Sequence, residues 1–175
     1  SLHDALPISH VARHGKLALV QFDAHQDTWD DGVGAISHGT FVLEAVREDL
    51  IDVERSIQVG IRTVAPRDCG IEVLDGYQAH ALGIEGVAAR IRQRVGQGPA
   101  YLTFDIDAVD PAFAPGTGTP VAGGLSSAQA LQMVWAIRDL DFRGMDIVEV
   151  SPPYDHADAT AIAGAAVAQH YIQAL

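Results

Sequence analysis

Apolar runs and helical stretches alternate along the chain. Continuous apolar segments predict buried strands, and apolar residues at three- and four-residue spacing predict helices. The predicted strands are 17–22, 56–61, 77–82, 100–104 and 144–150. The predicted helices are 40–49, 84–95, 127–140 and 157–175. This alternation is typical of an α/β fold with a mainly parallel sheet. Because no long linker or repeat divides the chain, we expect residues 1–175 to form a single domain.

Two clusters of polar residues directly follow predicted strands. The first cluster consists of Asp23, His25 and Asp27, and the second of Asp105 and Asp107. Side chains two residues apart in extended backbone point the same way, so each cluster can present its groups on one side. Four carboxylates held together in a low-dielectric crevice repel one another unless cations neutralise them. We therefore predict that these five residues bind two divalent metal ions.

The donor set contains one imidazole, four carboxylates and no thiolate. Such a set favours Mn²⁺ or a similar hard octahedral ion over a structural zinc ion. A water molecule that bridges two such ions loses a proton near neutral pH and becomes a nucleophile. The alternative is a pair of solvated acidic loops that cap helices. We favour the metal site because buried charge requires pairing or coordination.

Charge and composition restrict the classes of partner. The net charge is −12, from 23 acidic and 11 basic residues, which disfavours a nucleic-acid partner and favours a small cation or a metal. Cys69 is the single cysteine, so no intrachain disulfide framework forms, and a cytoplasmic location is expected. No apolar run approaches the ~20 residues that a membrane span requires, so no membrane partner is expected.

Four segments closely resemble a known family. They are Phe-Asp-Ala-His-Gln-Asp at 22–27, Ser-His-Gly-Thr at 37–40, Phe-Asp-Ile-Asp-Ala-Val-Asp-Pro-Ala-Phe-Ala-Pro-Gly-Thr-Gly-Thr-Pro at 104–120, and Val-Glu-Val-Ser-Pro-Pro-Tyr-Asp at 148–155. From about residue 12 onward the chain resembles the ureohydrolases, the family of arginases and agmatinases. The resemblance implies a three-layer arginase-like fold, a binuclear manganese site and a homo-oligomer.

The resemblance also implies roles for individual residues. Glu149 matches the carboxylate that binds the guanidinium of the substrate, and His38 matches the histidine that transfers a proton. Asp27 is implied both as a metal ligand and as a contact of the guanidinium or the leaving amine. The expected reaction is hydrolysis of a cationic guanidino compound, agmatine, to urea and putrescine. Arginases typically place an asparagine, which binds the α-carboxylate of arginine, where this chain has Trp29. Agmatine, which is decarboxylated arginine, is therefore favoured over arginine.

The front of the chain departs from the family pattern. Ureohydrolases have an upstream Gly-Gly-Asp-His segment that supplies a further metal-binding histidine, and the chain shows no such segment. We therefore interpret it as the C-terminal part of a ureohydrolase domain that lacks its first strands. Residues 1–9 do not follow the family pattern, and a non-native origin for them is left open. His3 is the nearest histidine in position but lacks the glycine context.

Several alternatives stay open at this point. A guanidinobutyrase or another hydrolase of guanidino acids would use the same motifs, because the residues that read the far end of the substrate lie in loops. An inactive fragment would keep the fold with an incomplete metal site. A metal-dependent deacetylase resembles the same overall fold, but we would expect a different His-His dyad and fewer carboxylate ligands.

Overall fold

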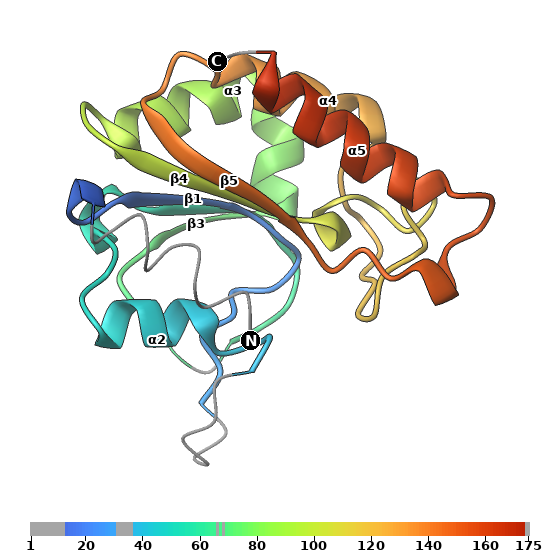
Figure 1. Cartoon of the computed structure of the whole chain (residues 1–175), viewed down its shortest axis with the longest axis horizontal. Coiled ribbons are helices and arrows are strands. Elements are labelled where there is room, and N and C mark those ends of the chain that lie inside the picture. The colour runs from blue at the N-terminus through green and yellow to red at the C-terminus, as the bar shows by residue number, and fades with distance from the viewer. Residues whose placement is uncertain (1–12, 31–36, 66, 68, 174–175) are drawn as a thin grey trace.

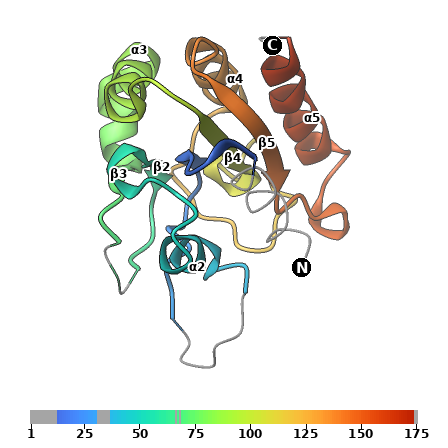
Figure 2. The same cartoon turned by 60° about the vertical axis from the view of Figure 1, so that its left-hand side comes forward.

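A parallel sheet lies between two layers of helices in the computed structural model (Figures 1 and 2). The structure describes residues 13–30, 37–65, 67 and 69–173. The strands are β1 (Ala18–Phe22), β2 (Ile57–Ile61), β3 (Glu72–Asp75), β4 (Ala100–Asp105) and β5 (Phe142–Val148). The helices are α2 (Phe41–Arg47), α3 (Gly76–Val95), α4 (Ser127–Ala136) and α5 (Ala159–Ile172), with short 3₁₀ turns η2 (Val53–Arg55), η3 (Ile106–Ala108) and η4 (Pro152–Tyr154). α2 covers one face of the sheet, and α3, α4 and α5 cover the other.

The sheet has the strand order β3-β2-β1-β4-β5, and every neighbouring pair is parallel. The register aligns Phe22 of β1 with Phe104 of β4, so that Asp23 follows β1 beside Asp105. The last residue of β5 pairs with Asp105, which brings Glu149 to the same edge. The predicted α/β fold with a mainly parallel sheet is confirmed. Its carboxyl edge collects the acidic residues that follow the strands.

One predicted strand is wrong. Residues 77–82 belong to helix α3, and the strand beside β2 is the earlier segment β3. The carboxylate of Asp75 accepts a hydrogen bond from the backbone N–H of Gln78, and the Gln78 side chain accepts one from the backbone N–H of Asp75. This capping box starts a helix immediately after β3. In a strand, Tyr77 and Ala79 would lie on the same face. Tyr77 is 90% exposed whereas Ala79 is fully buried, which agrees with a helix that has one exposed side.

The predicted helices occur with shifted ends. Within α3, Gly83 has φ 65° and ψ −178°, and this kink explains why the apolar pattern indicated a helix only from residue 84. A capping box of Ser126 and Gln129 opens α4. The last helix begins two residues later than predicted, because Ala157 and Asp158 both have positive φ angles.

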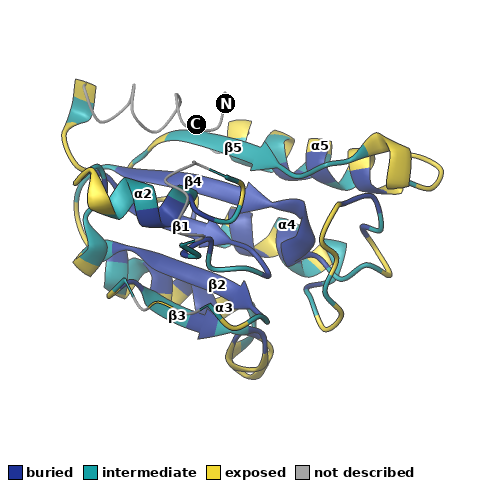
Figure 3. Ribbon diagram, turned by 90° about the horizontal axis from the view of Figure 1, so that it is seen from below, coloured by how far each residue is buried: buried dark blue, intermediate teal, exposed yellow. Residues whose placement is uncertain are grey.

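The main core lies between the sheet and helices α3, α4 and α5. The rings of Phe22 and Phe104 stack there with centroids 5.3 Å apart. A smaller apolar cluster, which includes Leu19, Val42 and Tyr101, fills the space under α2. β1, β2 and β4 are fully buried, whereas most of β5 is only half-buried (Figure 3). The rigid centre of the sheet therefore carries the strand ends from which the acidic residues project.

Some predictions concern residues outside this description. Residues 1–9, including His3, lie outside the described residues. The single-domain prediction for residues 1–175 stays a prediction. In the described part of the chain, no helix combines the length and the apolar character that crossing a membrane requires.

Candidate functional site

The same local turn follows β1 and β4. The carboxylate of Asp23 accepts a hydrogen bond from the backbone N–H of His25 at 2.6 Å. The carboxylate of Asp105 accepts one from the backbone N–H of Asp107 at 2.8 Å. Aspartate side chains commonly bend the backbone in this way, by bonding the N–H two residues ahead. Each strand thus ends in a turn that brings two side chains close together: His25 to Asp23 after β1, and Asp107 to Asp105 after β4.

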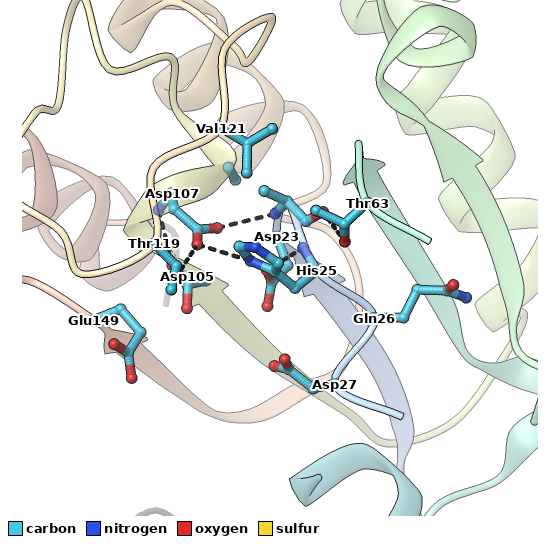
Figure 4. A network of polar contacts seen from close by, with 12 residues as sticks. Asp23, His25, Gln26, Asp27, Thr63, Asp105, Asp107, Thr119, Val121 and Glu149 are labelled. Atoms are coloured by element: carbon cyan, nitrogen blue, oxygen red, sulfur yellow. Dashed lines mark hydrogen bonds and ion pairs between the residues drawn. The ribbon is translucent and has the colours of Figure 1, made fainter. Parts of the chain in front are cut away.

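Hydrogen bonds join the two turns to each other (Figure 4). The backbone N–H of Ala24 donates to Oδ1 of Asp107 at 3.0 Å. Nδ1 of His25 lies 2.9 Å from Oδ2 of Asp107 and 3.4 Å from Oδ1 of Asp23. Asp23, His25 and Asp107 each offer a ligand atom, and these atoms all lie within 4.8 Å of one another. This spacing allows the three groups to bind one metal ion.

The remaining predicted ligands face the same space. Asp27 is 8% exposed and Asp105 is 5% exposed, so both carboxylates are withdrawn from solvent. Figure 4 shows the side chains of Asp27, Asp105 and Glu149 directed toward the space beside Asp23. The structure therefore brings all five predicted metal-binding residues together. Their role as ligands stays a prediction.

Burial disfavours the charged forms of three carboxylates in this site. Burial raises the pKa of Asp23 to about 6 and raises the pKa of Asp27 and Asp105 well above their usual values. Hydrogen bonds to Asp107 and Asp23 raise the pKa of His25 to about 10. Burial also acts on Asp107, but hydrogen bonds from His25 and Ala24 outweigh it and lower its pKa. Such a site favours the binding of cations, and oxygen donors with one imidazole suit hard divalent ions.

His38 and Glu149 meet beside this cluster although 111 positions separate them in the sequence. Nδ1 of His38 and the carboxylate of Glu149 are in direct contact. The His38 side chain is 76% exposed and that of Glu149 is 24% exposed, so the pair lies at the open side of the site. The structure thus places the two residues to which the resemblance assigns binding and proton transfer next to each other.

Two of the candidate residues have an uncommon backbone conformation. Asp27 has φ 53° and Glu149 has φ 63°. Residues other than glycine rarely occupy this left-handed region, and its cost is of order 1–3 kcal/mol. Such strain is concentrated at functional sites. The conformations at Asp27 and Glu149 therefore agree with a functional role for both positions.

Segment 37–40 is tied to the first cluster by the backbone. The N–H of Trp29 donates to the carbonyl of Gly39 at 3.0 Å, and the N–H of Leu43 donates to the carbonyl of Asp27 at 3.3 Å. The ring of Trp29 lies beside the imidazole of His25, with centroids 6.1 Å apart. Trp29 therefore forms part of the wall next to the candidate metal site.

The loop after η3 forms another wall of the site. The hydroxyl of Thr119 donates to Oδ2 of Asp107 at 3.2 Å. Arg62 binds this loop, because its guanidinium donates hydrogen bonds to the backbone carbonyls of Asp107 and Val121 at 2.7 Å each. The backbone N–H of Arg62 donates to the carbonyl of Ala24 at 2.9 Å. Arg62 thus links both acidic turns to the loop.

Gln21, Gln58 and Arg62 also contact the site, although they were not among the predicted site residues. Gln21 and Gln58 are fully buried in the centre of the sheet, and the amide of Gln21 donates to Asp23 at 2.7 Å. The available signal was a polar residue inside an otherwise apolar strand. For Arg62 the signal was a charged residue directly after the buried strand β2.

Comparison with known proteins agrees with this geometry. A sequence model of the arginase family matches residues 5–173. The agmatinase of Escherichia coli is 51% identical over 168 residues, which are 95% of this chain and 55% of the relative. The agmatinase of Cronobacter sakazakii is 52% identical over the same length, with the same shares of the two chains. The chain thus spans about half the length of these relatives.

Solved structures show the same relationship. The crystal structure of a hypothetical agmatinase from Burkholderia thailandensis has a TM-score of 0.95 and 50% identity, over 99% of this chain and 55% of the other. Proclavaminate amidino hydrolase from Streptomyces clavuligerus has a TM-score of 0.92 and 39% identity, over 99% and 60% of the two chains. The matched sequence, the shared fold and the gathered carboxylates lead to one conclusion: this chain belongs to the arginase family.

Proposed function

We propose that this chain forms the larger part of the active site of an agmatinase, a binuclear manganese hydrolase that converts agmatine to urea and putrescine. The observation that carries the proposal is the convergence of five predicted ligands beside the contact of His38 with Glu149. The similarity to agmatinases at about half sequence identity supports the choice of reaction.

The metal ions would be held by the five residues already described. These are Asp23, His25, Asp27, Asp105 and Asp107. When bound, two Mn²⁺ ions lower the pKa of a water molecule and orient that water toward the substrate. The burial of the carboxylates fits this role, because bound cations would balance charge that the fold otherwise holds at a cost.

Glu149 and Asp27 would bind the substrate. A carboxylate can accept two parallel hydrogen bonds from a planar guanidinium, which fixes both its position and its orientation. Glu149 follows β5 with a positive φ angle, and its carboxylate faces the cluster of predicted ligands (Figure 4). Asp27 would contact the guanidinium or the leaving amine from the opposite side.

His38 would transfer a proton to the leaving amine. An imidazole can both accept and donate a proton at its ring nitrogens, which suits this role. The contact with Glu149 would orient the ring toward the bound guanidinium. The exposed position of His38 would also allow proton exchange with solvent.

Agmatine is the proposed substrate because the chain offers Trp29 in the position that would contact the far end of arginine. Tryptophan presents a mostly apolar ring with one N–H donor, which suits an α-carboxylate less well than the amide of asparagine. A guanidino acid such as guanidinobutyrate is the second candidate. It is supported by the 39% identity with the proclavaminate amidino hydrolase of Streptomyces clavuligerus.

Three further properties belong to the proposal. We expect residues 1–175 to form a single domain, the protein to act in the cytoplasm, and the complete enzyme to form a homo-oligomer. The single cysteine, Cys69, is consistent with a reducing compartment.

A urea-release assay tests the proposed reaction. It uses this chain alone and an extended protein, in which the part of the E. coli agmatinase outside the matched 168 residues is joined to the chain. The extended protein should hydrolyse agmatine in the presence of Mn²⁺ and should show much less activity with arginine and guanidinobutyrate. The chain alone should release little or no urea even with excess Mn²⁺, because it corresponds to about half of an agmatinase.

Two outcomes would contradict the proposal. A folded extended protein that binds Mn²⁺ but prefers guanidinobutyrate would assign the chain to the second candidate. A folded extended protein that binds Mn²⁺ and hydrolyses no guanidino compound would refute the proposed reaction. Circular dichroism of the extended protein is the control for folding.

A further inference from the structure

Two glutamine side chains occupy neighbouring positions in the centre of the sheet. Gln21 of β1 pairs with Gln58 of β2 in the parallel register, and both residues have no exposed surface. Polar side chains in such a place are costly unless hydrogen bonds satisfy them. An apolar residue at either position would avoid that cost. Their presence therefore calls for an explanation beyond packing.

The two amides form a chain of hydrogen bonds in which Gln58 donates to Gln21 and Gln21 donates to Asp23. Nε2 of Gln58 donates to Oε1 of Gln21 at 2.6 Å and to the carbonyl of Gln26 at 2.7 Å. Because Oε1 of Gln21 accepts this bond, Nε2 of Gln21 is directed away from Gln58 and toward the acidic cluster. There it donates to Oδ2 of Asp23 at 2.7 Å and lies 3.4 Å from Oδ2 of Asp27. Gln58 thus fixes which end of the Gln21 amide faces the carboxylates.

We propose that Gln21 is a positioning residue that holds the carboxylates of Asp23 and Asp27 for metal binding, and that Gln58 acts through Gln21 by setting the orientation of its amide. Groups that hydrogen-bond metal ligands fix the direction of those ligands, and their loss typically costs 10–100-fold in metal affinity. The inference rests on the metal site of the proposed function and adds the residues that prepare it.

The geometry explains why one amide can serve two ligands. An amide NH₂ group has two protons, and an ionised carboxylate has lone pairs to spare for a metal ion after accepting one of them. Asp23 and Asp27 lie four residues apart, on either side of His25, whose carbonyl also lies 3.4 Å from Nε2 of Gln21. The amide therefore holds the whole turn that contains the first three predicted ligands.

The test measures Mn²⁺ binding by the full 175-residue chain. Isothermal titration calorimetry gives the affinity, and the electron paramagnetic resonance spectrum of bound Mn²⁺ reports the symmetry of the ligands. Gln21→Met keeps the length of the side chain but removes the donor, so the affinity should fall about 10–100-fold. Gln58→Met leaves the donor of Gln21 in place without its orientation, so the affinity should fall by a smaller factor.

The double variant separates positioning from general destabilisation. If Gln58 acts only through Gln21, the double variant should bind Mn²⁺ no more weakly than Gln21→Met, because the two losses are coupled. Gln129→Met is the matched control, since it also removes an amide hydrogen bond but does so in the capping box of α4, away from the cluster. It should lower the melting temperature and leave Mn²⁺ affinity and spectrum unchanged.

Three outcomes would overturn the inference. The first is a folded Gln21→Met chain with the affinity and spectrum of the unsubstituted chain, whatever its melting temperature. If Gln21→Met does not fold, unchanged affinity of Gln58→Met is the second. Failure of the folded, unsubstituted chain to bind Mn²⁺ is the third, and it would also refute the metal site of the proposed function. Binding by the unsubstituted chain with no effect at Gln21 would refute only the positioning role.

Discussion

Replacement of Asp105 by asparagine should have opposite effects on the stability of the metal-free chain and on metal binding. Asp105 is 5% exposed, and burial together with the charges of Asp23 and Asp107 raises its pKa. Its carboxylate accepts the backbone N–H of Asp107 at 2.8 Å. The amide oxygen of asparagine can accept the same bond, so the turn into η3 should survive. What the substitution removes is a buried negative charge.

The expected magnitude follows from the cost of that charge. A raised pKa means that the charged carboxylate is destabilised by about 1.4 kcal/mol for each pH unit between its ordinary and its raised pKa. Asp105→Asn should therefore stabilise the metal-free chain by roughly 1–3 kcal/mol near neutral pH, since it removes the charged form that burial penalises. For a protein of this size, each kcal/mol raises the melting temperature by about 2–4 °C. Binding of Mn²⁺ should decrease strongly, because a charged ligand is lost.

Two measurements on the same samples check this reasoning. Thermal unfolding in a chelator should show a higher melting temperature for the variant, and titration with Mn²⁺ should show a lower affinity and stoichiometry. Asp110→Asn is the control: its carboxylate accepts the N–H groups of Ala112, Gly123 and Gly124, and these bonds lower its pKa. That variant should lose stability and keep its Mn²⁺ affinity. A destabilised Asp105→Asn chain that binds Mn²⁺ normally would refute the argument.

Three further predictions concern other parts of the site. Glu149→Gln in the extended protein should lower kcat/KM by roughly 100-fold or more, because it removes a charged acceptor of the guanidinium, while Mn²⁺ content stays unchanged; loss of the metal would show that Glu149 has a different role. The pKa of Asp23 is raised from 3.8 to about 6 by burial, so its contribution to the stability of the metal-free chain is greatest below pH 3.8 and is lost as the pH rises through about 6. Chemical unfolding at a series of pH values measures this loss, and excess Mn²⁺ should reduce it; a contribution that grows with pH would contradict the shift. In Gly124→Ala the new Cβ would lie 2.6 Å from the backbone nitrogen of Asp110, which should cost about 1–3 kcal/mol of unfolding free energy, whereas Gly118→Ala meets no atom within 4 Å and should be tolerated.

The sequence was sufficient for the central strands of the sheet and for the residues of the acidic cluster. β1 and β4 are fully buried strands, so their apolar runs predicted central parallel strands correctly. Asp23 and Asp105 follow these strands, and a parallel sheet necessarily brings such residues to one edge. Carboxylates gathered at that edge would repel one another. This repulsion is the reason why the sequence predicted a metal site there.

One missed feature had a local signal. Residues 77–82 are apolar enough for a strand, but the capping box of Asp75 and Gln78, which lie three positions apart in the sequence, starts a helix there. Two other features depended on contacts that no local pattern contains. The role of Gln21 depends on its register with Gln58, which is a relationship between two strands. Arg62 contributes through carbonyl groups of a loop about sixty residues away, and every residue type presents the same carbonyl group. These features became visible only with the tertiary structure.

The position of Trp29 gives the protein a built-in optical probe. The chain has two tryptophans. The ring centroid of Trp29 lies 6.1 Å from that of His25. Trp135 is 41% exposed on α4, beside Arg138, and α4 covers the face of the sheet opposite α2. Indole emission responds to charge and polarity in its immediate surroundings, so cation binding next to His25 would change the fluorescence of Trp29 and leave that of Trp135 constant. A Trp135→Phe chain would therefore carry a single fluorophore whose emission follows occupancy of the site in real time.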